Sequence, residues 1–216
     1  MRALVVPMVT LAASVLMASP LLGAEQDRKQ AAVQAPAASP CASHSHVPES
    51  NRTTLGLYAS PLEAYDMWKA DPDGVRILDV RTFEEYLFVG HVEAAKNVPL
   101  VFPKYDPEGP SMPGRPPGCS GDFNTEFVAQ VKEAIEPDAV IVVMCSSGGR
   151  AAMAVDKLAE AGFTKVYNIV NGLEGDVVDD PGSAYFGKKM KNGWKNCGLP
   201  WTYSFDPDLM WVAPKK

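Results

Sequence analysis

A continuous apolar run at residues 139–144 constrains the fold of this chain more than any other feature of its sequence. Runs of this kind belong to strands that are buried on both faces, as in a parallel sheet. The run leads into a short glycine-containing segment and then into apolar residues at helical spacing, namely Ala151, Ala154, Val155, Leu158 and Ala159. A buried strand, a loop and an amphipathic helix in this order are typical of α/β folds.

The rest of the region from residue 52 onward alternates in the same way. Ser60, Pro61 and Glu63 together form a strong helix start, with a capping box and a proline at the first helical position. A second possible capping box at Thr82 and Glu85 predicts a short helix from residue 82. We expect a further helix over residues 125–135, strands at 75–80 and 165–170, and a short extended piece at 98–100. This alternation predicts an α/β domain with a central, mostly parallel sheet flanked by helices.

The N-terminus has the order of a secretory signal peptide. Arg2 is followed by an apolar stretch at residues 3–18, by Pro20 and then by the small Gly23 and Ala24. An uncleaved anchor is less favoured, because the stretch is short for the roughly 20 residues of a membrane span. We therefore expect a periplasmic or secreted protein that has no membrane contact once residues 1–24 are removed.

Three further segments complete the predicted organisation. Residues 25–51 are rich in Ala, Gln, Pro and Ser without a period, which predicts a flexible linker. Cys41, His44 and His46 lie in it, but no fold would hold them as metal ligands. Residues 52–175 form the α/β domain. Residues 176–216 are expected to form an extension packed on that domain, and they contain Trp194, Trp201 and Trp211.

Composition excludes several classes of protein. The hydrophobic fraction of 46% and the charged fraction of 21% argue against chain-wide disorder and against a multi-pass membrane protein. The net charge is −6, and no basic stripe is present, so we expect no nucleic-acid partner. Four cysteines are too few for a scaffold built from disulfides.

The loop at residues 145–150 carries the chemistry. It joins the C-terminal end of a buried strand to a helix, which is where ligands bind in open α/β sheets. Gly148 and Gly149 let backbone N–H groups point inward. The helix N-terminus and Arg150 both favour a thiolate at Cys145. The pattern predicts a nucleophilic cysteine that acts on an anion, with a buried, inert cysteine as the alternative.

Several motifs together carry a family resemblance. They are Ile77-Leu78-Asp79-Val80-Arg81, Glu84-Glu85-Tyr86, Gly90-His91, Ala94-Ala95, Asn97-Val98-Pro99 and the loop from Cys145 to Arg150. With them, the chain resembles a single-domain rhodanese, a sulfurtransferase, from about residue 57 to residue 170.

The resemblance implies a role for each motif residue. Cys145 would carry a persulfide as the catalytic residue. The substrate would be bound by the loop residues Ser146, Ser147, Gly148, Gly149 and Arg150. Asp79, Arg81, Glu85 and His91 would be structural, and an Arg81–Glu85 pair would brace the first strand–helix turn. No metal or organic cofactor is implied.

The expected function is therefore the transfer of sulfane sulfur from a small anion such as thiosulfate to a thiol or to a sulfur-acceptor protein. A persulfide carrier or anion-binding module with little small-molecule turnover is the main alternative, and a redox sensor is a third. Phosphatase activity is less favoured. Relatives with that chemistry place the arginine six positions after the cysteine, whereas Arg150 is the fifth.

Two cysteines lie in regions that depart from the family pattern. Cys119 belongs to a Pro- and Gly-rich insertion at residues 101–121, which is expected near the active site, and Cys197 belongs to the tail. They could form a disulfide, remain free, or supply a thiol that attacks the Cys145 persulfide. Spacing along the chain leaves these alternatives open, because a bridge depends on distance in the fold.

Overall fold

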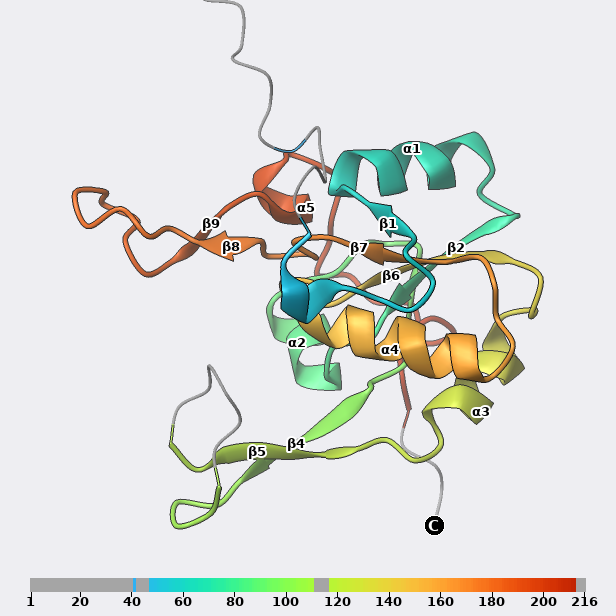
Figure 1. The fold of residues 1–216 in the computed structure, drawn as a ribbon, viewed down its shortest axis with the longest axis horizontal. Coiled ribbons are helices and arrows are strands. Elements are labelled where there is room, and N and C mark those ends of the chain that lie inside the picture. The colour runs from blue at the N-terminus through green and yellow to red at the C-terminus, as the bar shows by residue number, and fades with distance from the viewer. Residues whose placement is uncertain (1–40, 42–46, 111–116, 213–216) are drawn as a thin grey trace, which may run out of the picture. The chain divides into compact units, whose positions relative to one another are not determined.

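A computed structural model of the chain describes Cys41, residues 47–110 and residues 117–212. The predicted signal peptide (1–24), His44 and His46 lie outside these residues. The described part is built on a five-stranded sheet, with α1 on one face and α4 on the other (Figure 1). None of the helices in this part is long and apolar enough to cross a bilayer.

The helices and strands follow one another along the chain as predicted in outline. In order they are η2 (Glu49–Asn51), β1 (Tyr58–Ala59), α1 (Pro61–Ala70), β2 (Val75–Asp79), α2 (Phe83–Phe88), β3 (Ala95–Asn97), β4 (Val101–Tyr105), β5 (Cys119–Phe123), α3 (Phe127–Ala134), β6 (Val140–Met144), α4 (Gly149–Glu160), β7 (Val166–Ile169), β8 (Asp176–Val177), β9 (Lys189–Lys191) and α5 (Gly193–Asn196).

The main sheet has the strand order β1-β7-β6-β2-β3, and every pairing in it is parallel. The expectation of an α/β fold with a mostly parallel sheet is thus confirmed. The central strand β6 is buried on both sides. Val143 packs in the cluster that includes residues of α3 and α4, whereas Val142 and Met144 pack in the cluster that includes residues of α1 and α5. The apolar run at 139–144 therefore reflects burial on both faces.

Two helices begin at capping boxes that are visible in the sequence. At α1, Ser60 accepts from the Glu63 N–H and the Glu63 carboxylate accepts from the Ser60 N–H. At α2, Thr82 and Glu85 make the same reciprocal pair. Each cap satisfies backbone donors that the helix leaves open, a stabilisation of about 1 kcal/mol.

One strand lies three residues earlier than predicted. The extended piece was expected at 98–100, but the strand is β3. Val98 and Leu100 continue alongside the end of β2, where their N–H groups donate to the carbonyls of Asp79 and Val80 at 3.0 and 3.1 Å. The apolar pattern missed β3 because it includes Asn97, a fully buried polar residue whose amide donates to two main-chain carbonyls.

The insertion at 101–121 forms an antiparallel hairpin of β4 and β5, which extends away from the main sheet (Figure 1). The sequence analysis placed no strand in this insertion, and two of its strand positions are held by Pro103 and Gly121, which are poor strand residues. Both are tolerated here, since a two-stranded ribbon consists of two edges and proline is confined to edges. The two residues lie directly opposite each other in the register.

The region before the domain is not simply a linker. Residues 47–51, the end of the predicted flexible segment 25–51, lie on the domain, where Asn51 is 5% exposed. Cys41 forms a disulfide with Cys197, 156 residues further along the chain. The proposed Cys119–Cys197 bridge is therefore wrong, and Cys119 is a free thiol. Composition could not reveal this attachment, because it depends on partners that are distant in sequence.

The tail packs closely on the domain. Trp194 is fully buried in the cluster that contains residues of α1, and its ring meets Tyr65 edge-on at 5.8 Å. Further along the tail, Thr202 pairs with His91 through both main-chain groups, and the Leu209 carbonyl accepts from the Asn97 N–H at 2.8 Å. From α5 onward the tail thus contributes to the core and runs along the domain, whereas the β8–β9 hairpin extends away from it (Figure 1).

We expect peptide mapping without reduction to yield a linked Cys41–Cys197 peptide, with Cys119 and Cys145 open to alkylation after unfolding. Cys197→Ser should lower the free energy of unfolding by about 2–5 kcal/mol under oxidising conditions, because the bridge closes a long loop. Denaturant titration measures this loss, with Cys119→Ser as the thiol control. A peptide that links Cys119 to Cys197 would contradict the observed pairing.

Candidate active site

Cys145 directly follows the central strand β6, and α4 begins four residues later at Gly149. The residue therefore lies at the carboxyl edge of a parallel sheet, between two neighbouring strands that end at the same edge. Its side chain is 1% exposed and belongs to the apolar cluster on the α4 face. The position is the one that the sequence predicted for a nucleophile.

The loop directs a backbone donor at the sulfur. The Gly148 N–H donates to Cys145 Sγ at 3.1 Å. Gly148 adopts φ +101°, a left-handed conformation that side chains rarely accept. A Cβ there would also lie 2.4 Å from Asn51 Nδ2. Glycine is therefore required both for the turn and for the space around it.

The outer side of the loop is held by the chain that follows β7. The Leu173 and Glu174 N–H groups donate to the carbonyls of Cys145 and Ser146 at 2.8 and 2.9 Å. Gly172 permits this approach, because a Cβ at its position would lie 2.3 Å from the Cys145 carbonyl oxygen. These bonds fix two of the loop's carbonyl groups.

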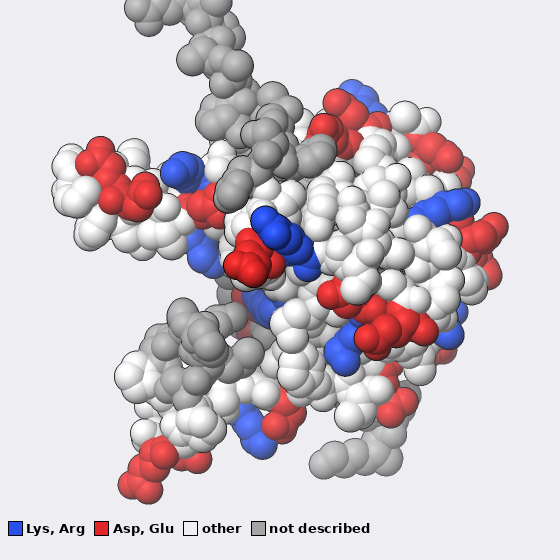
Figure 2. All heavy atoms as spheres, in the orientation of Figure 1, with Lys and Arg blue, Asp and Glu red and all other residues white. Residues whose placement is uncertain are grey.

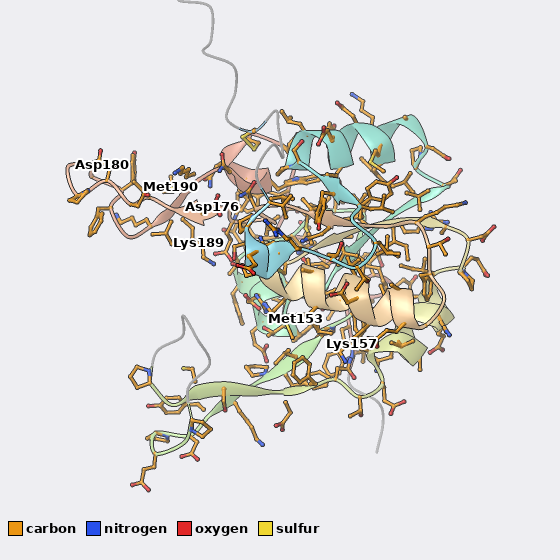
Figure 3. All side chains as sticks on the ribbon, viewed as in Figure 1. Met153, Lys157, Asp176, Asp180, Lys189 and Met190 are labelled. Atoms are coloured by element: carbon orange, nitrogen blue, oxygen red, sulfur yellow. A yellow bond between two sulfur atoms is a disulfide. The ribbon has the colours of Figure 1, made fainter. Side chains whose placement is uncertain are left out.

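Two residues that contact the loop were missed by the sequence analysis. Asn51 Nδ2 donates to the Ser147 carbonyl at 3.1 Å. Lys189 reaches from the β8–β9 hairpin toward the start of α4 (Figure 3), donates to Ser146 Oγ and lies 3.6 Å from Glu174. Neither residue carried a local signal, because each comes from a segment whose sequence shows no motif. Their contacts arise only from the folded arrangement.

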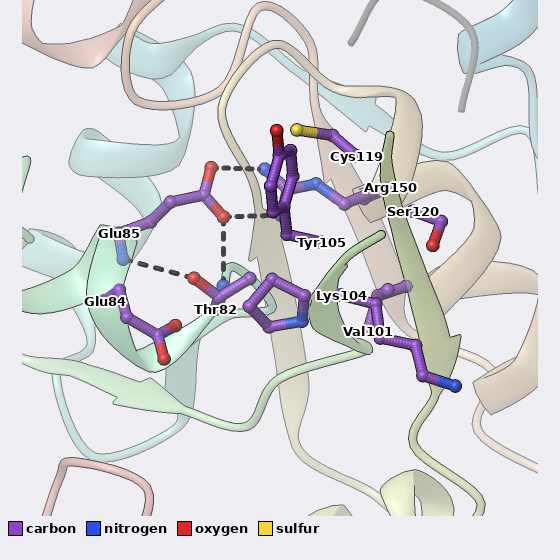
Figure 4. A pocket seen from close by; sticks show the side chains of 10 residues that line it. Thr82, Glu84, Glu85, Val101, Lys104, Tyr105, Cys119, Ser120 and Arg150 are labelled. Carbon is purple, nitrogen blue, oxygen red and sulfur yellow. Dashed lines mark hydrogen bonds and ion pairs between the residues drawn. The ribbon is translucent and has the colours of Figure 1, made fainter. Parts of the chain in front are cut away.

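Arg150, the last residue of the loop, forms a two-point ion pair with Glu85 of α2 (Figure 4). The two distances are 2.6 and 2.7 Å, and both side chains are largely buried. Burial alone would raise the pKa of Glu85, but the hydrogen bonds and charge of Arg150 lower it to about 2. Burial likewise acts to lower the pKa of Arg150, and Glu85 outweighs it, so that this pKa is raised.

The expected ion pair between Arg81 and Glu85 is wrong. Arg81 binds Asp79 instead, with the Nη2–Oδ2 distance at 2.6 Å and both side chains fully buried. Its contact with Glu85 is a long bond of 3.4 Å to the main-chain carbonyl, and it also donates to the Gly90 carbonyl. Burial lowers the pKa of Arg81, but Asp79 more than offsets this and raises it. The pair that the resemblance implied does not form because the carboxylate of Glu85 binds Arg150 of α4 instead.

His91 connects the domain to the tail. Its Nδ1 lies 3.0 Å from the Tyr86 carbonyl and its Nε2 lies 3.1 Å from the Ser204 carbonyl. Its ring stacks on that of Tyr86 at a centroid distance of 3.7 Å. These contacts with Tyr86 and Ser204 suit the structural role that the resemblance implied.

A cavity of about 410 Å³ lies between the β4–β5 hairpin and the start of α2 (Figure 4). The residues that line it are Thr82, Glu84, Glu85, Val101, Pro103, Lys104, Tyr105, Cys119, Ser120 and Arg150. Arg150 of the active-site loop lines this cavity together with residues of the hairpin. The insertion therefore borders the active-site loop, as expected. Within the described residues, no group of three or more His, Cys, Asp or Glu side chains is placed to hold a metal ion.

We expect the Glu85–Arg150 pair to make stability depend on acid pH. The folded pKa of Glu85 is about 2 against an ordinary value of 4.5, so its contribution is complete above pH 4.5 and is lost as the pH falls toward 2. The contribution is on the order of 3 kcal/mol. Urea unfolding of the parent and Glu85→Gln across this range measures it. Parallel stability curves for the two proteins would contradict the assignment.

Comparison with known proteins places this site in a family. The model of the rhodanese-like domain matches residues 60–177. The chain is 37% identical over 132 residues to thiosulfate sulfurtransferase 16, chloroplastic, of Arabidopsis thaliana, which covers 61% of this chain and 88% of the relative. It is 36% identical over 99 residues to thiosulfate sulfurtransferase 18 of the same plant, and this alignment covers 46% of this chain and 64% of the relative.

A solved structure agrees with the sequence relatives. The crystal structure of Rv0390 from M. tuberculosis superposes with a TM-score of 0.51 at 27% identity, covering 68% of this chain and 99% of that one. Residues 60–177, which match the family model, contain β2, β3, β6 and β7 of the parallel sheet, the Cys145 loop and the Asp79–Arg81 pair. The chain belongs to the rhodanese-like family, and the two plant relatives described above are named as sulfurtransferases.

Proposed function

We propose that this protein is an exported sulfurtransferase that moves sulfane sulfur from thiosulfate or a similar anion to a thiophilic acceptor through a persulfide on Cys145. One observation carries the proposal most directly. Cys145 ends the central strand, and the Gly148 N–H is directed at its sulfur at 3.1 Å. A donor in this position stabilises negative charge on the sulfur, which both half-reactions require.

In the first half-reaction, the Cys145 thiolate attacks the outer sulfur of thiosulfate. A bond forms between Sγ and this sulfur, and the sulfur–sulfur bond of the donor breaks. Sulfite leaves with the bonding electron pair, and the enzyme retains a persulfide with one negative charge. Charge is conserved, because a thiolate and a dianion give a persulfide anion and a dianion. The mechanism is covalent and ping-pong.

In the second half-reaction, a nucleophilic acceptor attacks the outer sulfur of the persulfide. In the cell the acceptor is a thiol, on a small molecule or on a partner protein, and in an assay it can be cyanide. The bond between Sγ and the outer sulfur breaks, and Cys145 leaves as a thiolate. The same backbone donor then stabilises the leaving group, so the enzyme returns to its starting form without a further co-reactant.

Export is supported by two independent features. The N-terminal sequence has the order of charge, apolar core and small residues that defines a signal peptide. The Cys41–Cys197 disulfide lies outside the active-site loop and joins two segments, as expected of a structural bridge. Bridges of this kind persist in oxidising compartments and are rare in the cytosol.

We expect Cys145→Ser to abolish sulfur transfer and leave the fold intact, because a hydroxyl is a far weaker nucleophile than a thiolate. Intact-protein mass after thiosulfate treatment should show one added sulfur atom in the parent and none in the variant. Cyanide-dependent turnover then separates the two functions. Rapid turnover supports the enzyme, and a stable persulfide with negligible turnover would instead show a carrier. Sulfur uptake by the variant would remove Cys145 from the mechanism.

We expect Arg150→Ala to weaken both stability and the use of anionic donors. Both terminal nitrogens of Arg150 bind Glu85, so the variant removes the guanidinium that balances this largely buried carboxylate and should lose about 3–5 kcal/mol of stability. If Arg150 also attracts the substrate, kcat/KM should fall about tenfold or more with thiosulfate. The comparison with a neutral organic polysulfide donor tests this role, because equal losses with both donors would leave Arg150 a structural residue.

A further inference from the structure

We propose that Asn51 is a positioning residue of the active-site loop, whose side-chain amide fixes the peptide bond between Ser147 and Gly148 so that the Gly148 N–H points at the Cys145 sulfur. This inference rests on the proposed function, because it assigns a role to the residue that shapes the persulfide site. Asn51 precedes the span that matches the family model, residues 60–177. It also lies in the segment that the sequence analysis treated as a flexible linker.

The geometry links two hydrogen bonds through one rigid group. Asn51 Nδ2 donates to the Ser147 carbonyl oxygen at 3.1 Å. The nitrogen of the same peptide bond belongs to Gly148, and its N–H donates to Cys145 Sγ at 3.1 Å. A trans peptide is planar, and its C=O and N–H point in opposite directions. Fixing the oxygen on one side therefore fixes the donor on the other.

The loop does not fix this peptide through side chains of its own. Gly148 has φ +101° and ψ −27°, and glycine can reach both halves of the backbone map at little cost. Rotation of the Ser147–Gly148 unit would turn its carbonyl toward the sulfur, where an oxygen repels a thiolate. The Asn51 amide opposes this rotation because it would lose its acceptor.

Asn51 is itself held in place from two sides. Its main-chain carbonyl accepts from the Asn168 side chain at 2.9 Å, and Asn168 is fully buried on β7, the neighbour of β6. Its Oδ1 accepts from Ser50 Oγ at 3.1 Å, which orients Nδ2 toward the loop. The side chain is thus anchored to the same sheet that carries Cys145.

The expected consequence is chemical and not only structural. The donor acts on charge at the sulfur, which is present in the attacking thiolate and in the leaving thiolate. Losing it should lower kcat with little change in KM, and should move the pH dependence of Cys145 alkylation to higher pH. The other charged groups at the loop are Arg150 with its partner Glu85 and Lys189 with its partner Glu174, and the variants change none of them, so the shift reports the loop peptide.

The test uses Asn51→Leu, which keeps the side-chain size and removes the donor. We expect kcat to fall about tenfold or more and the midpoint of Cys145 alkylation by iodoacetamide to rise by on the order of one pH unit. Asn51→Gln retains an amide donor, so it should recover part of the lost kcat and part of the shift in the alkylation midpoint. If the leucine variant does not fold, Asn51→Ser gives the same readouts, because its shorter side chain does not reach the Ser147 carbonyl.

Thr54→Val is the matched control. Thr54 holds the same N-terminal segment on α4 through a 2.8 Å bond from Oγ1 to Asp156, and it does not contact the loop peptide. It should lower stability slightly and leave the alkylation midpoint unchanged. The proposal is overturned if the Asn51 variants leave the midpoint unchanged, or if Thr54→Val moves it equally. A parent protein without sulfur transfer would refute the proposed function alone, since the alkylation readout does not depend on turnover.

Discussion

The ion pair between Arg150 and Glu85 connects the parts of this protein on which the site depends. Arg150 ends the Cys145 loop and begins α4, and Glu85 caps α2 with the same carboxylate. A charged pair that is largely removed from water must keep both partners, because either one alone would be strongly destabilised. The loop after β6 and the turn after β2 are therefore held in one relative position. The same pair forms a wall of the cavity under the β4–β5 hairpin.

A second buried pair supports this arrangement from within the sheet. Asp79 at the end of β2 binds the Arg81 guanidinium, which in turn donates to the carbonyls of Glu85 and Gly90. The turn that presents Glu85 is thus built around a buried cation with several acceptors. Charged groups in this setting contribute geometry more than stability, because their desolvation offsets much of their attraction. The Asp79–Arg81 pair therefore keeps the turn that presents Glu85 in a fixed position.

The loop itself is completed by segments on either side of the region that matches the family. Asn51 precedes that region, and Lys189 follows it on the β8–β9 hairpin. Acidic and basic side chains are interspersed on the face shown in Figure 2. The disulfide joins Cys41, upstream of Asn51, to Cys197, next to α5. Covalent attachment and site geometry therefore involve the same two flanking segments.

The sequence by itself determined the features that depend on neighbours along the chain. The apolar run predicted β6, and two capping boxes predicted the starts of α1 and α2. The glycines of the loop predicted backbone N–H groups that point inward at Cys145. Each signal is local, because burial periodicity and helix caps are set by residues a few positions apart. The position of β3 was predicted three residues too late because buried Asn97 interrupts the apolar pattern on which that prediction relied.

Only the tertiary structure decided which distant groups meet. It paired Cys197 with Cys41, 156 residues earlier in the chain, instead of with Cys119. It also placed Asn51 behind the loop peptide and turned a Pro- and Gly-rich insertion into a hairpin beside Arg150. The physical reason is that the cost of closing a loop depends only weakly on its length. Spacing along the chain therefore does not select among distant partners, and packing and hydrogen-bond geometry do.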